Sequence, residues 1–487
     1  MTLQLFNVLG REKQPFKPIT EGRVGMYVCG PTVYEHSHLG HAKTYVSFDV
    51  VVRYLRWRGY ELLYVQNITD VGHLRENEED RVLARAAQLN AKPMQVVETY
   101  TRSYFEDMDS LGVMRPDISP RASGHVPEQI EMIETLLANG NAYIADGNVY
   151  FDVRSDADYG KLSNRRVEEQ QDESRELIGG GKQHPADFAL WKRADPEHIL
   201  RWNSPWGEGF PGWHIECSAM AKKYLGANFD IHGGGIDNIY PHNENEIAQS
   251  ECANHEAFAN YWMLTGSLNV LDPDEGIPVK MSKSLGNYIT IKDALKNWKP
   301  QTLRYFILTS HYSSPVVYGE EALASAKAGC ERLMNARQLV LRQLNSAPAG
   351  GAGNGFLERL DKANADFRAV MDDDFNSPRG IATLQDLTRD VNSLLNSDAE
   401  IGADTLAAIN ATYQALGGDV LGLLDDEAAD GGGDSQREAA LIELLVEMRA
   451  QARAQRDYAR SDHIRDQLLA LGVALEDRAD GTLWKLQ

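Results

Sequence analysis

The spacing of hydrophobic and polar residues changes along the chain, and these changes divide it into regions with different folds. Near the start, short apolar runs at 25–29 and 62–67 alternate with runs at 40–58 and 80–90 that have a helical period. Strands that alternate with helices are typical of a parallel sheet, because each helix carries the chain back across the sheet. We therefore predict an α/β fold for the first part of the chain.

An insertion interrupts this pattern from about residue 118 to 205, where proline-rich turns, a helix at 128–139 and a hairpin at 143–153 replace the strand–helix units. The α/β pattern resumes with a helix at 213–225 and a strand at 229–232. The parallel sheet is thus predicted to be built from two separate parts of the sequence.

The second half of the chain is mainly helical. From 320 to about 425, apolar residues recur at three- and four-residue spacing, which predicts helices throughout. A glycine-rich linker follows at 428–434. The last fifty residues contain two helical runs, at 437–458 and 461–471, and a predicted hairpin at 473–486.

Composition favours a globular protein. The 487 residues are enough for two to four domains, and no apolar run is long enough to cross a membrane. The four cysteines are too few and too scattered for a disulfide framework. Because the first residues also lack the features of a signal peptide, we expect a cytoplasmic location and no membrane partner.

The formal net charge of −22 argues against nucleic acid binding over the whole surface, since a phosphate backbone is bound mainly by Lys and Arg. Affinity depends on the local field at the contact surface, however. We therefore expect confined basic patches, with 280–299 and 437–465 as the candidates.

Two short segments far apart in the sequence indicate a site that splits ATP. His38-Leu39-Gly40-His41 places two imidazoles at i and i+3, on one face at the start of a predicted helix, where free backbone N–H groups favour anions. Lys280-Met281-Ser282-Lys283-Ser284 places two lysines, which are mobile point charges, on a polar loop. Either segment alone is more often a surface histidine pair or a solvated turn.

Four further residues form a candidate zinc set: Cys29, Cys217, His242 and Glu246. His242 and Glu246 are four residues apart and would share a helical face. Both cysteines are expected near the carboxyl ends of strands, where open α/β sheets place ligands. The residues alone leave two alternatives open, which are buried structural cysteines and an ion pair at a helix start.

Longer segments around these residues resemble the cysteinyl-tRNA synthetase family. HLGH and KMSKS, in this order, are similar to the two signatures of class I aminoacyl-tRNA synthetases. The cysteinyl family in particular is suggested by YVCGPTVYEHSHLGHAKTY, DFALWK, PGWHIECSAM, DIHGGGIDNIYPHNENEIAQSE and VKMSKSLGN, and again by the segment at 461–484. The resemblance implies a Rossmann-type catalytic domain with an insertion, then a helical domain and a small α+β C-terminal domain.

Domain boundaries follow from the pattern together with the resemblance. The expected domains are 1–117 and 206–270 (the two halves of the catalytic domain), 118–205 (insertion), 271–319 (the KMSKS-containing, stem-contact region), 320–427 (helical, tRNA-binding), 428–436 (linker) and 437–487 (anticodon recognition).

The resemblance also implies an activity, the ligation of L-cysteine to tRNA(Cys) through a cysteinyl-adenylate, with ATP as substrate and Mg²⁺ beside it. In that family the residues aligned with Cys29, Cys217, His242 and Glu246 hold one zinc ion per chain, which recognises the substrate thiol, so no editing domain is required. The chain departs from the family at Asn243, where a second histidine is usual. We therefore expect the hydrogen bonding around the metal to differ from that of the family. Separately, we expect the protein to be a monomer.

Other residues receive roles only through the resemblance. Charge on the phosphates would be stabilised by His38, His41, Lys280 and Lys283. The residues expected to bind the rest of ATP are Gly40, His232, Gly234, Asp237 and again Lys283. Those expected near the amino acid are Gly30, Thr32, Thr69 and Trp213. The candidates for reading the anticodon are Arg460, Asp462, Asp477 and Trp484.

Three rival functions remain open. A cysteine ligase of the mycothiol pathway resembles the same catalytic core but transfers cysteine to an amino-sugar, and its members lack the tail that matches at 461–484. A non-catalytic tRNA-binding paralogue could lose HLGH and KMSKS freely, yet both are intact. A zinc hydrolase would need a coordination position that is open to water.

Overall fold

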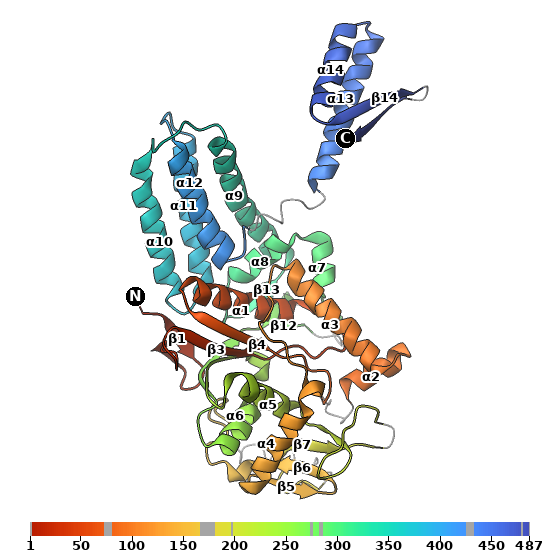
Figure 1. The fold of residues 1–487 in the computed structure, drawn as a ribbon, viewed down its shortest axis with the longest axis vertical. Helices are drawn as coiled ribbons and strands as arrows, with labels where there is room; N and C mark the ends of the chain where they lie inside the picture. The colour runs from red at the N-terminus through yellow and green to blue at the C-terminus, as the bar shows by residue number, and fades with distance from the viewer. Residues whose placement is uncertain are drawn as a thin grey trace. The chain divides into compact units, whose positions relative to one another are not determined.

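The predicted parallel sheet is present in the computed structural model, with the strand order β10-β9-β3-β4 (Figure 1). Its strands are β3 (Arg23–Val28), β4 (Glu61–Gln66), β9 (Phe229–Gly235) and β10 (Ala259–Thr265), and all three pairings are parallel. Most residues of these strands are buried, because helices cover both faces of the sheet. This confirms the α/β prediction, including the assembly of the sheet from two parts of the sequence.

The structure describes residues 2–72, 80–165, 181–195, 198–272, 276–281, 286–424, 433–478 and 481–486. The chain forms two compact units, residues 1–424 and 425–487. Among the described helices, none combines the length and the apolar character that a membrane span requires.

Three helices flank the sheet and carry most of the candidate residues. Helix α1 (Leu39–Trp57) follows β3, α5 (Trp213–Leu225) precedes β9, and α6 (Glu244–Asn254) joins β9 to β10. In Figure 1, α1 lies on one side of the strands, and α5 and α6 lie on the other. The predicted helices at 40–58 and 213–225 are therefore confirmed.

The insertion contains helix α4 (Val126–Ala138) and a four-stranded antiparallel sheet in the order β5-β6-β7-β8. Its strands are β5 (Ala142–Ala145), β6 (Asn148–Phe151), β7 (Phe188–Arg193) and β8 (Gly209–Pro211). The predicted hairpin is confirmed as β5 and β6. The sheet also takes up β8, whose three residues are too few to show an alternating pattern in the sequence.

The remaining elements of the larger unit surround this framework. They are β1 (Gln4–Asn7), β2 (Glu12–Pro15), α2 (Arg81–Leu89), α3 (Pro93–Ser110), β11 (Leu268–Leu271), β12 (Pro278–Lys280), α7 (Ile291–Asn297), α8 (Pro300–Leu308), β13 (Val316–Tyr318), α9 (Glu320–Leu344), α10 (Leu357–Met371), α11 (Ser377–Leu395) and α12 (Ala403–Tyr413). Helices α9 to α12 pack as a bundle and confirm the helical region.

The smaller unit has a core of its own. It consists of α13 (Gly433–Ala454), α14 (Tyr458–Ala470) and an antiparallel hairpin of β14 (Val473–Arg478) and β15 (Gly481–Leu486). Ile442, Leu468 and Val473 form the buried centre of this unit. The two predicted helices and the predicted hairpin are confirmed.

Helix α1 is fixed by a buried charge pair. The side chains of Asp49 in α1 and Arg304 in α8 form an ion pair and are almost fully buried. Arg304 also donates from Nε to Leu421 O at 2.6 Å, and Asp49 accepts from the Met114 amide at 2.8 Å. The pair therefore joins α1 to the helical region and to the segment after α3.

Removing one partner of this pair tests how far it determines stability. Arg304→Ala removes one of the two guanidinium groups that pair with the buried Asp49 carboxylate and leaves only Arg53, at 2.7 Å, so we expect the free energy of unfolding of the larger unit to fall by about 3 kcal/mol, the lower end of the range for a broken buried ion pair. The exposed pair between Arg359 and Asp390 (3.1 Å) is the control, and Arg359→Ala should cost about 0–1 kcal/mol. Urea unfolding followed by tryptophan fluorescence measures both, and equal effects would contradict the prediction.

Candidate functional site

A cavity of about 1110 Å³ opens at the carboxyl ends of the parallel strands. Its lining includes Cys29 after β3, Asn67 after β4, Gly235 at the end of β9 and Thr265 at the end of β10. Open α/β sheets place their ligands at this edge. The cavity is therefore the candidate site, and most of the sequence-predicted residues line it.

The two histidines of HLGH stack on each other at the start of α1, with ring centroids 3.9 Å apart. His38 is the N-cap and accepts the Gly40 amide at Nδ1 (3.0 Å), while His41 Nδ1 accepts the His38 amide (3.2 Å). A neutral ring whose Nδ1 accepts must carry its proton on Nε2. Both rings line the cavity and can therefore act as N–H donors.

Burial keeps both rings neutral. Burial lowers the pKa of His38 to about 4. The charge of Lys280 also lowers this pKa, whereas the charge of Asp237 raises it. Burial and the neighbouring His38 also lower the pKa of His41 well below its usual value. Near neutral pH the pair therefore offers hydrogen bonds without a full positive charge.

The absence of a side chain at Gly40 leaves room for the His38 ring. A Cβ at this position would lie 2.7 Å from the His38 ring, so only glycine lets His38 fold back over the first turn of α1. The glycine thus has a structural reason beside the contact with ATP that the resemblance implies.

Lys280 ends β12 and lines the cavity, where its Nζ lies 2.7 Å from Asp237 Oδ1. Both side chains are more than 60% exposed, so the pair can be exchanged for a ligand at little cost. Lys283, the second predicted lysine, lies outside the described residues.

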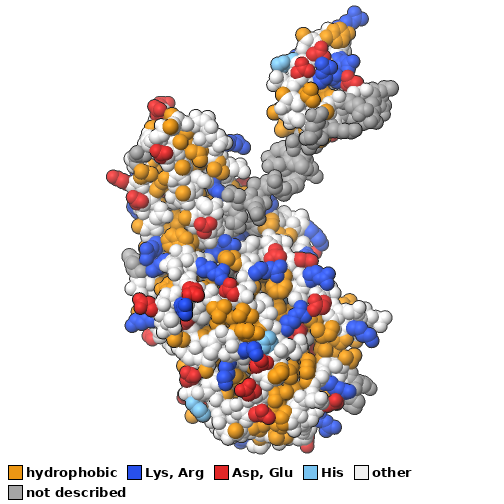
Figure 2. All heavy atoms as spheres, in the orientation of Figure 1, with side chains coloured by type: hydrophobic (Ala, Val, Ile, Leu, Met, Phe, Trp, Pro, Cys, Tyr) orange, Lys and Arg blue, Asp and Glu red, His pale blue; other side chains and the backbone are white. Residues whose placement is uncertain are grey.

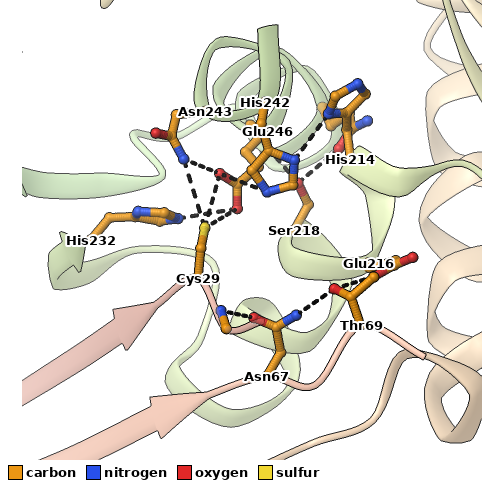
Figure 3. Close-up of polar contacts among 12 residues, drawn as sticks. Cys29, Asn67, Thr69, His214, Glu216, Ser218, His232, His242, Asn243 and Glu246 are labelled. Carbon is orange, nitrogen blue, oxygen red and sulfur yellow. Dashed lines mark hydrogen bonds and ion pairs between the residues drawn. The ribbon is translucent and has the colours of Figure 1, made fainter. Parts of the chain in front are cut away.

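The four candidate metal ligands converge. One ligand atom each from Cys29, Cys217, His242 and Glu246 lie within 4.8 Å of one another, and all four residues are buried. Cys29 follows β3 and Cys217 belongs to α5, whereas His242 lies two residues before α6 and Glu246 lies within it. Figure 3 shows Glu246 and His242 facing Cys29 across this space.

The donor set fits a zinc ion, for which thiolate, imidazole and carboxylate are the usual ligands. His242 Nδ1 lies 3.0 Å from His214 Nδ1, which leaves His242 Nε2 free to face the cluster. The Tyr27 hydroxyl is fully buried and has no partner among the described residues, and its pKa is raised by burial and by the Cys217 thiol. A neutral phenol beside a thiol is suited to donate to a metal-bound thiolate.

A chain of hydrogen bonds connects the neighbours of the two cysteines (Figure 3). The Gly30 amide donates to Asn67 Oδ1 (2.7 Å), Asn67 Nδ2 donates to Thr69 Oγ1 (3.0 Å), and Thr69 Oγ1 donates to Glu216 Oε2 (3.0 Å). Gly30 follows Cys29, and Glu216 precedes Cys217. A Cβ on Gly30 would lie 1.6 Å from Asn67 O, so this position requires glycine.

The other residues predicted to contact substrates divide into two groups. Thr32, Thr69 and Trp213 line the cavity, and the Trp213 ring lies 4.4 Å from the His242 ring. His232 and Gly234 are absent from the described lining. The His232 side chain instead points into the donor cluster, with Nε2 3.1 Å from Glu246 Oε1 and its ring stacked on Trp262.

Sequence reasoning did not single out Asn67, His214, Glu216 or Tyr27. Each lies close to a candidate residue that is far away in the sequence, and no local spacing signals this proximity. Only Asn243, which stood out as a departure from the family, could be suspected in advance.

The four candidates in the smaller unit have local partners. Asp477 accepts from Arg449 (2.7 and 2.8 Å) and from Arg453, and Arg449 holds the pKa of this carboxyl well below its usual range. Trp484 packs against the small core, and Asp462 lies 3.7 Å from Arg465. Arg460 lies in the first turn of α14, where its amide donates to Asp457 Oδ1. Figure 2 shows blue and red side chains side by side on this unit.

Comparisons with known proteins agree with this geometry. A family model described as "tRNA synthetases class I (C) catalytic domain" matches residues 15–328, and one described as "DALR domain" matches 366–425. A relative named "Cysteine--tRNA ligase" from Deinococcus radiodurans is 47% identical, over 99% of this chain and 96% of its own length. Another of that name, from a strain of Thermus thermophilus, is 46% identical over 100% of both chains.

Solved structures share the fold. Mycobacterium tuberculosis methionyl-tRNA synthetase in complex with methionyl-adenylate has a TM-score of 0.57 at 16% identity, and covers 86% of this chain and 96% of its own. Agrobacterium radiobacter LeuRS, from a ternary complex with tRNA, has a TM-score of 0.62 at 12% identity and covers 85% of both chains. At these identities the likeness concerns the fold alone.

The protonation of His38 can be tested directly. Because burial lowers its pKa to about 4, we expect its ring resonances in NMR spectra to stay constant from pH 8 to about 5 and to shift only below that. The unfolded chain binds the proton near pH 6.5, so the stability that the neutral ring contributes is lost as the pH falls from 6.5 through 4. Titration near pH 6.5 in the folded protein would contradict this.

Proposed function

Because the chain belongs to the cysteine–tRNA ligase family of class I aminoacyl-tRNA synthetases, we propose that it attaches L-cysteine to tRNA(Cys) in two steps through a cysteinyl-adenylate. The observation that carries this proposal is the buried cluster of two cysteines, a histidine and a glutamate beside the cavity that the HLGH histidines line. The cluster can hold a metal ion that recognises a thiol, and the histidines can donate hydrogen bonds to phosphate oxygens.

In the first step, a carboxylate oxygen of cysteine attacks the α-phosphorus of ATP, and the bond from that phosphorus to the bridging oxygen breaks. Pyrophosphate leaves with the electron pair of the broken bond. Because the substrate carboxylate is the nucleophile, the reaction requires no nucleophile from the protein. His38 and His41 donate from Nε2 to phosphate oxygens as charge develops on them. Lys280 leaves Asp237 to bind the polyphosphate, Lys283 assists it, and Mg²⁺ accompanies ATP.

Cys29, Cys217, His242 and Glu246 would hold one zinc ion. When bound, zinc supplies a strong preference for a thiolate over an alcohol, which pocket shape alone could not provide for cysteine against serine. The protein itself orients the metal ligands. The hydrogen bonds from Gly30 through Asn67 and Thr69 hold the two cysteine-bearing segments at a fixed separation.

In the second step, a ribose hydroxyl at the 3′ end of the tRNA attacks the cysteinyl carbonyl, and AMP leaves. The helical region would carry the tRNA, and residues 437–487 would read the anticodon. Five arginines against two aspartates between 449 and 465 support this assignment: Arg449 and Arg453 are paired with Asp477, and the other three add positive charge to a chain whose net charge is −22.

Transfer to an amino-sugar is the second candidate function, since it uses the same activation step. The C-terminal residues after 424, which we call the tail, weigh against this candidate. The curated cysteine–tRNA ligases match 99% or more of this chain, so their similarity includes the residues after 424.

Charging of purified tRNA(Cys) with labelled cysteine and labelled serine, side by side, tests the proposal. We expect cysteine to be attached and serine to remain at background, with cysteine-dependent exchange between ATP and pyrophosphate. Exchange without charging would instead favour the amino-sugar acceptor. The absence of both reactions in the presence of zinc would favour a non-catalytic tRNA-binding protein.

Cys217→Ser tests the metal in the same assays, and we expect it to lower both the zinc content and the exchange rate, because an alcohol is a weak zinc ligand. Cys252→Ser is the matched control, since Cys252 lies on α6 outside the cluster. Unchanged zinc in Cys217→Ser by elemental analysis would remove this residue from the set.

The tail is tested separately with Trp484→Ala. If Trp484 helps to read the anticodon, we expect the KM for tRNA to rise while pyrophosphate exchange is unchanged, because activation takes place in the other unit. Trp484 also packs on the small core, so Trp484→Phe, which keeps an apolar ring there, serves as the control for folding. Equal loss of charging and exchange would contradict the assignment.

A further inference from the structure

Asn243 touches two of the four metal-ligand candidates. Its side chain is fully buried and absent from the described cavity lining. Its Nδ2 lies 2.7 Å from Glu246 Oε2 and 3.7 Å from Cys29 Sγ (Figure 3). An amide nitrogen carries two N–H groups, so it can serve both acceptors at once.

The two acceptors determine which way the Asn243 amide faces. Exchanging its nitrogen and oxygen would bring a carbonyl oxygen to 2.7 Å from a carboxylate oxygen, with no proton between them. Asn243 Oδ1 has no partner among the described residues, although it is shielded from water. Because a buried acceptor without a partner costs free energy, the contacts of Nδ2 must maintain this orientation.

We propose that Asn243 is a positioning residue for the metal-binding cluster, which holds the Cys29 thiolate and the Glu246 carboxylate with one N–H group each. This inference rests on the proposed zinc site. Cys29 Sγ lies 3.8 Å from Glu246 Oε2, so two groups that are anionic in a metal site stand close together. The shared amide fixes both, while His232 holds the other carboxylate oxygen at 3.1 Å.

The amide has an advantage over an imidazole at this position. A neutral imidazole has a single N–H group and could serve only one of the two acceptors. A charged imidazole would place a cation beside the metal. Asparagine supplies two donors and no charge, which suits a cluster that must keep its anionic ligands for a divalent ion.

Zinc affinity of the full-length protein is the first measurement, obtained by competition with a chromophoric chelator. Loss of a hydrogen bond to a metal ligand typically weakens binding about 10–100-fold, and we expect this for Asn243→Ala. Asn243→Asp has nearly the same shape but places a carboxylate beside two anionic ligands, so its loss should be at least as large. Asn243→His keeps one donor and should fall between Asn243→Ala and the unaltered protein.

Asn245→Ala is the matched control. Asn243 is the N-cap of α6, and Asn245 lies two residues further on in the first turn of this helix and is almost equally buried, but it accepts from the Tyr159 hydroxyl at 2.5 Å instead of facing the cluster. We expect its zinc affinity to be unchanged. An equal loss of affinity in Asn245→Ala would mean that any disturbance of α6 weakens the site, and this would overturn the proposal.

Cobalt substitution gives a second readout that does not depend on catalysis. Thiolate-to-cobalt charge-transfer bands report on Cys29 and Cys217, and we expect them to shift in Asn243→Ala but not in Asn245→Ala. If Asn243→Ala does not fold, as judged by circular dichroism, Asn243→His provides the test. Unchanged affinity and spectra in the folded Asn243 variants would overturn the positioning role alone, whereas failure of the unaltered protein to bind zinc would overturn the proposed metal site as well.

Discussion

Four groups that are costly to bury lie together at the edge of the parallel sheet, and much of the surrounding structure serves to hold them there. Two thiols, a carboxyl group and an imidazole lie within 4.8 Å of one another and away from solvent. In a medium of low dielectric constant, their ionised forms lose hydration and the anions repel one another. Burial raises the pKa of Cys217, whereas a hydrogen bond from Cys217 lowers the pKa of Cys29. A divalent cation would remove this conflict, because every anion then gains an opposite charge.

The fold positions these groups by rigid means. Cys29 stands at the end of β3, whose register with β4 and β9 is fixed by parallel pairing on both sides. His242 and Glu246 are carried by the segment that enters α6, and Cys217 comes from the facing helix α5. Between them, the hydrogen bonds through Asn67 and Thr69 connect the two cysteine-bearing segments across the sheet edge. A selective site requires such fixed distances, because small displacements of the ligands weaken metal binding strongly.

The sequence predicted those parts of the site that have a local signal. The spacing of His38 and His41 indicated a shared face, and the position of Cys29 after an apolar run indicated the ligand-binding edge of the sheet. The contacts of Thr69 with Glu216 and of His214 with His242 could not be predicted in this way, because they join residues that only the tertiary fold brings together. The same reason explains His232, which the resemblance placed near ATP, whereas its side chain lies 3.1 Å from Glu246. Secondary structure followed a similar rule, since long periodic helices were predicted well and the three-residue strand β8 was not.

The strong acidity of the chain is compatible with two polyanionic substrates if positive charge is concentrated where each of them binds. At the end of the cavity where we propose that ATP binds, two neutral histidines offer N–H groups, and the positive charge comes from lysines such as Lys280, whose ion pair with Asp237 is exposed. In the smaller unit, arginines gather near the turn between α13 and α14, and two of them are fixed by Asp477. Acidic surface elsewhere repels a phosphate backbone and so disfavours binding in the wrong register. The net charge of −22 thus restricts where an RNA can dock and does not prevent docking.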